Sequence, residues 1–227
     1  MASNNKIRII EFTGLPACGK TTLCSSMLED SSNHKFYLSS HFSVLNKERA
    51  HLLSLFKHIS LKYLIALIYY LTINNISRKK GMLIYMLNLY VQYSIFFNKH
   101  CNDSSIMLVD QGIVQGLGSL SLGCPDVKTK GLKFMLKSWK RFESQILLVD
   151  CKIPAEESVD RLTKRNTSGG EFDRLRGNEL TNAMRSHILL LEKVKDELQK
   201  SGFCFKTVSL DMQNPIKSNI ELLYKQI

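Results

Sequence analysis

Short apolar runs alternate with helical stretches along most of the chain. Mostly apolar runs occupy residues 7–12, 106–109 and 146–149, and residues 203–210 alternate between apolar and polar side chains. Runs of this length that end at Gly or Asp are typical of strands buried in a parallel sheet. A short second strand is expected at 35–38, and helices are expected at 21–28, 154–165, 180–200 and 216–227. Strands that alternate with helices predict an α/β fold.

The segment between residues 40 and 100 is unusually apolar. Two runs, 61–73 and 82–97, are separated by the polar stretch 74–81. Both are shorter than the ~20 residues that a membrane-spanning helix needs, so no membrane association is expected. They are better interpreted as long helices of a helical subdomain at about 43–100, which pair as a hairpin at 75–80. Their broad apolar surface predicts burial on several sides or an oligomer face, and therefore a possible homodimer.

A phosphate-loop motif follows the first strand. The sequence Gly14-Leu-Pro-Ala-Cys-Gly19-Lys20-Thr21 matches G-x-x-x-x-G-K-[ST] without substitution. The two glycines let successive N–H groups turn inward, and the start of the next helix adds partial positive charge. Lys20 would neutralise the β- and γ-phosphates, and the Thr21 hydroxyl would ligate Mg²⁺. A glycine-rich turn without a ligand is the alternative, but the strand before the motif and the helix after it favour nucleotide binding.

The expected ligands are ATP and Mg²⁺. The residues expected to bind the nucleotide are Gly14, Leu15, Pro16, Ala17, Cys18, Gly19, Lys20, Thr21 and Thr22.

An acidic residue, Asp110, follows the apolar run 106–109. Because ligand groups in open α/β sheets gather at the carboxyl ends of strands, we expect Asp110 to face the phosphate loop. There it would ligate Mg²⁺ with Thr21, order water, or act as the base for an acceptor hydroxyl. The alternative is an Asp that starts a turn after a strand.

Arginines flank a flexible segment near residue 170. Arg161 and Arg165 lie four residues apart on one helix face, the polar loop 166–170 follows, and Arg174 comes next. A basic helix end, a glycine hinge and a further arginine predict a lid over about 161–176 that closes on phosphates. A solvated helix with paired charges is the alternative.

Length and charge narrow the class of protein. A chain of 227 residues with 44% hydrophobic and 22% charged residues is typical of one globular domain. The net charge of +11 suits nucleic acid, an anionic surface or phosphorylated small molecules. The densest basic cluster, within 128–141, has the three- and four-residue spacing of a solvated helix face. No nucleic-acid module is recognised, so no nucleic-acid partner is expected.

The six cysteines form no C-x-x-C pair. This pattern predicts reduced thiols in a cytoplasmic protein and no cysteine metal site. Cys24, Cys151 and Cys204 are expected to be small core residues.

Together these motifs resemble the P-loop nucleoside and nucleotide kinases, nearest to the thymidylate kinase family. The matching segments are the phosphate loop, the strand that ends at Asp110, the stretch 147–165, and Phe172-Asp-Arg174. The resemblance implies a single three-layer P-loop domain over 1–227, with a parallel five-stranded sheet, helices on both faces and a helical acceptor and lid region. It also implies Mg-ATP as donor and catalytic roles for Lys20, Asp110, Arg161, Arg165 and Arg174.

Two positions depart from the thymidylate kinase pattern. The family usually has Asp where this chain has Pro16, and Arg where it has Gln111. Both departures lie on the acceptor side, so they weaken thymidine monophosphate as the acceptor.

The sequence therefore predicts ATP- and Mg-dependent phosphoryl transfer to a nucleoside monophosphate or related small acceptor. One alternative is a kinase for a nucleoside or another small hydroxyl compound. Another is a non-kinase P-loop ATPase or switch coupled to a partner, and a nucleic-acid-binding ATPase is suggested by charge alone. A GTPase is not expected, because the chain has no Asn-Lys-x-Asp motif.

Overall fold

A parallel five-stranded sheet forms the centre of the computed structural model, which describes residues 6–30, 34–42, 59–73, 79–100, 103–121, 132–165 and 172–227. The strand order is β2-β3-β1-β4-β5, and every pairing is parallel. The strands are β1 (Ile9–Gly14), β2 (Phe36–Leu38), β3 (Ile106–Val109), β4 (Ile146–Lys152) and β5 (Lys206–Asp211).

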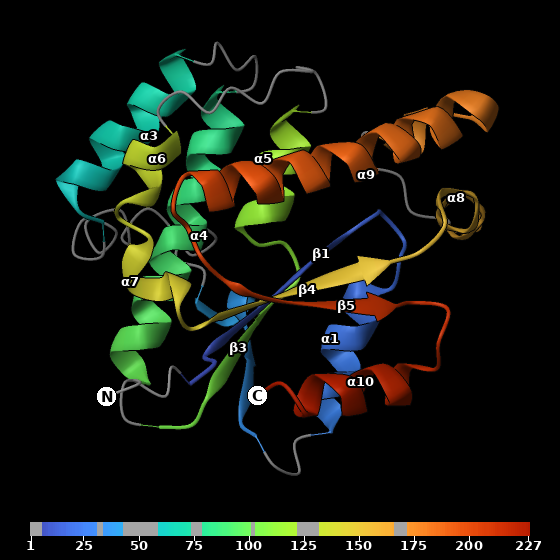
Figure 1. Ribbon diagram of the computed structural model, residues 1–227, viewed down its shortest axis with the longest axis horizontal. Helices are drawn as coiled ribbons and strands as arrows, with labels where there is room; N and C mark the ends of the chain where they lie inside the picture. The colour runs from blue at the N-terminus through green and yellow to red at the C-terminus, as the bar shows by residue number, and fades with distance from the viewer. Residues whose placement is uncertain are drawn as a thin grey trace.

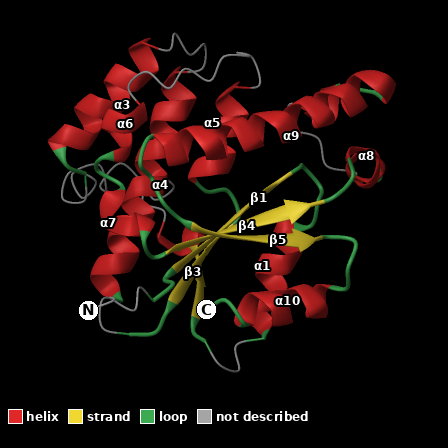
Figure 2. Ribbon diagram, in the orientation of Figure 1, coloured by secondary structure: helices red, strands yellow, loops and turns green. Residues whose placement is uncertain are grey.

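Helices cover both faces of the sheet, so the predicted three-layer α/β fold is confirmed (Figures 1 and 2). One face packs against α3 (Leu61–Ile73), α4 (Lys79–Lys99), α5 (Ile113–Ser121), α6 (Leu132–Leu136) and α7 (Lys140–Glu143). The other packs against α1 (Lys20–Glu29), α8 (Ala155–Thr163) and α10 (Ile216–Tyr224). The long helix α9 (Gly177–Lys200) contributes side chains to the apolar cores on both faces of the sheet. The described residues also form the 3₁₀ helices η1 (Ser39–Phe42) and η3 (Phe172–Arg174).

The central strand β1 is buried over its whole length. Ile10 and Phe12 face the α1 side, whereas Ile9 faces the α4 side. Because side chains alternate along a strand, Glu11 and Thr13 also point toward the α4 side. This alternation places two polar side chains inside the core, directly before the phosphate loop.

The apolar helices α3 and α4 pack against each other and against the sheet. Tyr63 of α3 stacks on Tyr90 of α4 with ring centroids 4.1 Å apart, and its hydroxyl donates to the carbonyl oxygen of Met86. Trp139 packs edge-on against both rings. The apolar surface expected from the sequence therefore forms one core with the sheet. The predicted hairpin at 75–78 and the first part of the predicted subdomain, 43–58, lie outside the described residues.

Within the described part of the chain, every helix is too short or too polar to cross a membrane.

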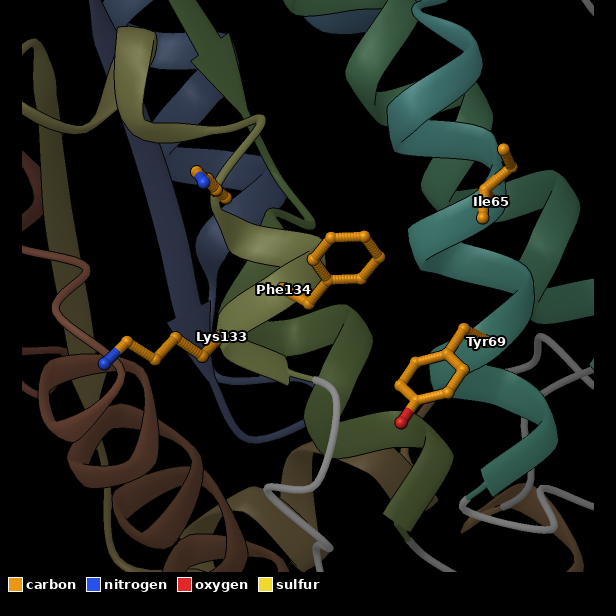
Figure 3. Close-up of a pocket in the computed structure, with 5 residues that line it drawn as sticks. Ile65, Tyr69, Lys133 and Phe134 are labelled. Carbon is orange, nitrogen blue, oxygen red and sulfur yellow. The ribbon is translucent and has the colours of Figure 1, made fainter.

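The outer face of α3 remains apolar and exposed. Ile65 and Tyr69 lie across a groove from Phe134 of α6, and Lys133 and Lys137 complete the groove lining (Figure 3). This groove lies between α3 and α6, away from the carboxyl end of β1 (Figure 1). The homodimer expected from the sequence stays a prediction, because no partner chain is present.

The helix α5 was not expected from the sequence. Gly116 and Gly118 lower its intrinsic helix propensity, but neighbouring side chains occupy the space that larger residues would need. A Cβ atom on Gly116 would lie 2.2 Å from Cε1 of Tyr85, and one on Gly118 would lie 2.6 Å from Cδ2 of Leu191. Tertiary packing therefore overrides local propensity here.

The basic segment differs from the single solvated helix that we expected. Two short helices, α6 and α7, are separated by the fully buried Trp139. Lys133, Lys137 and Lys140 are exposed as predicted, but the guanidinium of Arg141 lies 4.4 Å from the ring centroid of Phe142. The part of the cluster at 128–130 lies outside the described residues.

Of the cysteines expected in the core, Cys24 and Cys151 are buried. The expectation for Cys204 was wrong, because it is exposed in the turn before β5.

Close packing between α4 and α5 predicts different effects for two glycine substitutions. Gly116→Ala should lower the free energy of unfolding by about 1–3 kcal/mol, because the new methyl group overlaps the Tyr85 ring. Gly81→Ala, in the first turn of α4, meets no atom within 4 Å and should raise it by up to about 1 kcal/mol. Urea denaturation of both variants measures the difference. Equal effects at the two sites would contradict the described packing of α5.

Candidate active site

The phosphate loop has the backbone conformation that its sequence predicts. Gly14 has φ 148° and Gly19 has φ 105°, both in a region that favours glycine. A Cβ atom on Gly14 would also lie 2.4 Å from the carbonyl oxygen of Cys151. Ala17 adopts φ 57°, which is uncommon for a residue with a side chain. The loop is therefore held in a strained curve that ends at the first residue of α1.

The Lys20 ammonium lies against the inside of this loop. Its Nζ donates to the carbonyl oxygens of Gly14 at 3.0 Å and Leu15 at 2.8 Å, and lies 3.4 Å from Sγ of Cys18. A lysine is a compact point charge with several donors, so it can exchange these partners for phosphate oxygens.

Thr21 and Asp110 meet at the mouth of the loop. The parallel pairing of β1 with β3 aligns Glu11 with Val109 and brings the two strand ends together. As a result the Thr21 hydroxyl donates to Oδ2 of Asp110 at 2.8 Å. The other carboxylate oxygen, Oδ1, is buried and has no partner among the described residues.

These two side chains fit a magnesium ion. A hydroxyl and a carboxylate are the hard oxygen ligands that Mg²⁺ prefers, and the ion usually takes its remaining ligands from water and substrate phosphates. The orphaned Oδ1 atom of Asp110 is an available ligand. The described residues contain no cluster of three or more His, Cys, Asp or Glu side chains that could bind a metal by themselves. The donor set therefore suits a nucleotide-bound Mg²⁺.

The three predicted lid arginines lie in different surroundings. Arg161 donates to the carbonyl oxygens of Cys18 and Met212 and pairs with Glu157 at 2.6 Å, so it braces the outer side of the loop. Arg165 and Arg174 are exposed, and neither side chain has a hydrogen-bond or ion-pair partner among the described residues. The connecting loop 166–171 lies outside the described residues.

Sequence reasoning missed a buried polar pair beneath the loop, Gln115 of α5 and His187 of α9. Oε1 of Gln115 accepts from the backbone N–H of Gly14 at 3.1 Å and from the Thr13 hydroxyl. The amide nitrogen must then donate to Nε2 of His187, 3.3 Å away, which assigns the imidazole proton to Nδ1. Gln115 lies five residues after Asp110 in the sequence, but no local pattern indicated that its side chain contacts the phosphate loop.

His187 is a neutral imidazole in this environment. Burial, and then the charge of Lys20, lower its pKa from 6.5 to about 4. Its Nδ1 atom is buried without a partner among the described residues, and its ring packs against Phe172 of η3 at a centroid distance of 5.4 Å. The residues that return from the predicted lid therefore contact the same side chain that supports the phosphate loop.

A second missed group, Glu11, supports the loop that carries Asp110. Its carboxylate accepts from the backbone N–H of Ile113 at 3.0 Å and from the Tyr93 hydroxyl. A Cβ atom on Gly112 would lie 2.1 Å from Oε2 of Glu11, so glycine is required there. Tyr85 closes the other side by donating to the carbonyl oxygens of Gln111 and Gly112. These contacts account for the glycine in the sequence Asp110-Gln-Gly.

The structure describes the surroundings of Gln111 and Pro16, the two residues that differ from the thymidylate kinase pattern. Gln111 is exposed beside Asp110, and the carbonyl oxygen of Pro16 accepts a 2.6 Å hydrogen bond from the Ser158 hydroxyl. Among the described residues, no lysine or arginine forms a hydrogen bond or ion pair with residues 110–112.

No family model and no curated protein matches the chain. Among solved structures it is similar to deoxyadenosine kinase from M. mycoides with dATP bound, at 13% identity over 96% of this chain and 98% of that chain, with a TM-score of 0.48. The same enzyme with dCTP bound is similar at 12% identity over 96% of this chain and 97% of that chain, with a TM-score of 0.48. Its structure with the products dCMP and dCDP has the same identity and coverage and a TM-score of 0.45. These likenesses span nearly the whole chain, but at such identities and TM-scores they establish no family. The named enzymes are deoxyadenosine kinases, so they add nothing specific to the thymidylate kinase resemblance.

The buried Glu11 predicts a pH dependence of stability. Burial raises its pKa from 4.5 to about 7, so the folded chain retains a proton that the unfolded chain releases as pH rises through this interval. Stability should therefore fall between pH 5 and pH 8. Glu11→Gln removes this titration, and its stability relative to wild type should rise by about 2–3 kcal/mol over the same interval.

Urea denaturation at pH 5 and pH 8 measures this change. Glu221→Gln, which alters an exposed carboxylate on α10, is the matched control and should show no pH-dependent gain. Parallel curves for wild type and Glu11→Gln would mean that the Glu11 pKa is not raised.

Proposed function

We propose that this protein is a kinase that transfers the γ-phosphoryl group of Mg-ATP to a nucleoside, a nucleotide or a related small acceptor. The observation that carries the proposal is the 2.8 Å contact between Thr21 and Asp110 at the mouth of an unsubstituted phosphate loop. A structural turn does not require a strand-end carboxylate to meet the helix-start hydroxyl, whereas a metal-nucleotide site does.

Each residue of the site has a different role in the proposed phosphoryl transfer. Loop N–H groups and Lys20 bind the phosphates, and Thr21 with Asp110 would hold Mg²⁺, which neutralises charge on the β- and γ-oxygens when bound. Arg161 supports the loop from outside, while Arg165 and Arg174 would approach the phosphates if the segment 161–176 closes as a lid. Catalysis here depends on positioning and charge neutralisation rather than on a covalent intermediate.

The acceptor class is the finer part of the proposal. A nucleoside monophosphate is the first candidate, on the resemblance to nucleotide kinases. An uncharged hydroxyl acceptor is the second, because the described residues place Gln111 and Tyr85 rather than an arginine beside Asp110. A phosphate acceptor requires a cation at this point, and an arginine fork suits it best. An alcohol requires only a base, for which Asp110 is placed.

An ADP-release assay over a panel of acceptors tests both parts. We expect release that depends on one class of nucleoside or nucleotide, with poor turnover of thymidine monophosphate. Lys20→Met should lower kcat by at least about 10²-fold without loss of the folded state, because the γ-phosphate charge is left unneutralised. ADP release that is independent of every small acceptor but stimulated by a protein or DNA would replace the kinase with a coupled ATPase.

The metal assignment has its own test. Asp110→Asn should raise the Mg²⁺ concentration for half-maximal turnover and lower kcat by about 10²-fold, because a neutral amide is a weaker ligand. Asp160→Asn is the matched control, since Asp160 forms only an exposed ion pair with Lys164. Titration of both variants with MgCl₂ at fixed ATP makes the comparison. An unchanged Mg²⁺ dependence in Asp110→Asn would remove Asp110 from the metal site.

A further inference from the structure

Two cysteines meet beneath the phosphate loop. Cys18 belongs to the loop, and Cys151 is paired through its strand with Gly14. A Cβ atom on Gly14 would lie 3.2 Å from Sγ of Cys18 and 3.2 Å from Cβ of Cys151, so only the missing glycine side chain leaves room for both residues. The two side chains are therefore neighbours across the loop and β4. Both are free thiols.

Their electrostatic surroundings differentiate the two thiols. Nζ of Lys20 lies 3.4 Å from Sγ of Cys18. The hydrogen bond from Cys151, together with the charge of Lys20, lowers the pKa of Cys18 to about 6, and the same pairing and burial raise the pKa of Cys151. Of the two, Cys18 is therefore the thiol that ionises more readily. The thiolate is the nucleophilic form of cysteine.

We propose that Cys18 and Cys151 form a peroxide-sensitive dithiol that switches nucleotide binding at the phosphate loop. The Cys18 sulfur attacks one oxygen of hydrogen peroxide, the O–O bond breaks, and a sulfenic acid and hydroxide form. Cys151 then loses its proton to hydroxide, and its sulfur attacks the Cys18 sulfur and displaces the sulfenic oxygen as hydroxide, which takes up the proton that Cys18 released when it ionised. Two thiols are oxidised to one disulfide, and one peroxide is reduced to two water molecules.

The disulfide would change the loop in two ways. A sulfur–sulfur bond of about 2.05 Å is much shorter than a hydrogen-bonded contact, so Cys18 must move toward β4. Movement at Cys18 displaces its neighbours Ala17 and Gly19, whose positive φ angles define the curve of the loop. The bond also removes the thiolate that faces Lys20. Nucleotide phosphates would compete for the same ammonium, so bound ATP should protect Cys18 from oxidation.

Burial restricts which reagents reach the pair. Cys18 is 0% exposed and Cys151 is 2% exposed, so a peroxide close to water in size is the expected oxidant. Cys24 can be compared with Cys18 in the same molecule. Both thiols are buried, but burial raises the pKa of Cys24, so Cys24 should react more slowly with peroxide. Among the described cysteines, Cys204 is the exposed one and should react with bulky aromatic disulfides in the folded protein.

The experiment treats the full chain with hydrogen peroxide, with and without ATP. Peptide mass mapping locates disulfides, and the fluorescence anisotropy of a labelled ATP analogue reports nucleotide binding. We expect a Cys18–Cys151 disulfide, loss of nucleotide binding that a dithiol reductant restores, and oxidation at least about tenfold slower with saturating ATP. Cys151→Ala should instead accumulate irreversible sulfinic acid at Cys18, because no resolving thiol is present. Cys24→Ala, the matched control, should behave like wild type.

Several outcomes would overturn the proposal. Sulfinic acid at Cys18 of the wild type without a disulfide would exclude Cys151 as the resolving thiol. A disulfide that leaves nucleotide binding unchanged would exclude the switch. If Cys151→Ala does not fold, mapping of the wild type and of Cys151→Ser decides the same question. The proposal rests on the proposed nucleotide binding at the loop. Reduced protein that binds no ATP would refute the proposed function and with it the switch, whereas reduced protein that binds ATP and forms no disulfide would refute the dithiol alone.

Discussion

The parallel pairing of β1 with its two neighbours is the constraint on which the rest of this structure depends. β1 lies between β3 and β4, so its carboxyl end opens between the ends of both strands. On one side Asp110 follows β3 and meets Thr21. On the other side the carbonyl oxygen of Cys151 lies so close to Gly14 that only glycine fits. The sheet therefore brings Thr21 and Asp110 together and forms the floor of the phosphate loop.

Polar groups buried beside this strand end connect the loop to the helices above it. Glu11 binds the first N–H group of α5, and Gln115, two residues later in α5, binds the N–H group of Gly14. His187 of α9 completes the set. Buried polar groups are costly unless they are hydrogen-bonded, so each bond restricts α5 and α9 to one position relative to the loop. The loop that carries Asp110 is thereby held by hydrogen bonds at both of its sides.

The sequence was most informative where a short motif has a physical requirement of its own. The spacing from Gly14 to Thr21 predicted the loop and the start of its helix, and the apolar runs predicted the strands of the sheet. The adjacency of Asp110 and Thr21 also followed, because parallel strands end at the same edge. Helix α5 did not follow, since its glycines have low helix propensity and their purpose is visible only when Tyr85 and Leu191 are in place.

What the sequence alone determined is most of the helices and strands and the conformation of the phosphate loop, because both depend on residues close in the chain. Only the tertiary structure decided which side chains from distant parts of the sequence surround the loop. Gln115 and His187 are separated by 72 residues, and Cys18 and Cys151 belong to different elements. No local pattern records such pairs, because their partners are chosen by the packing of helices on the sheet. The raised pKa of Glu11 and the lowered pKa values of His187 and Cys18 all arise from that packing.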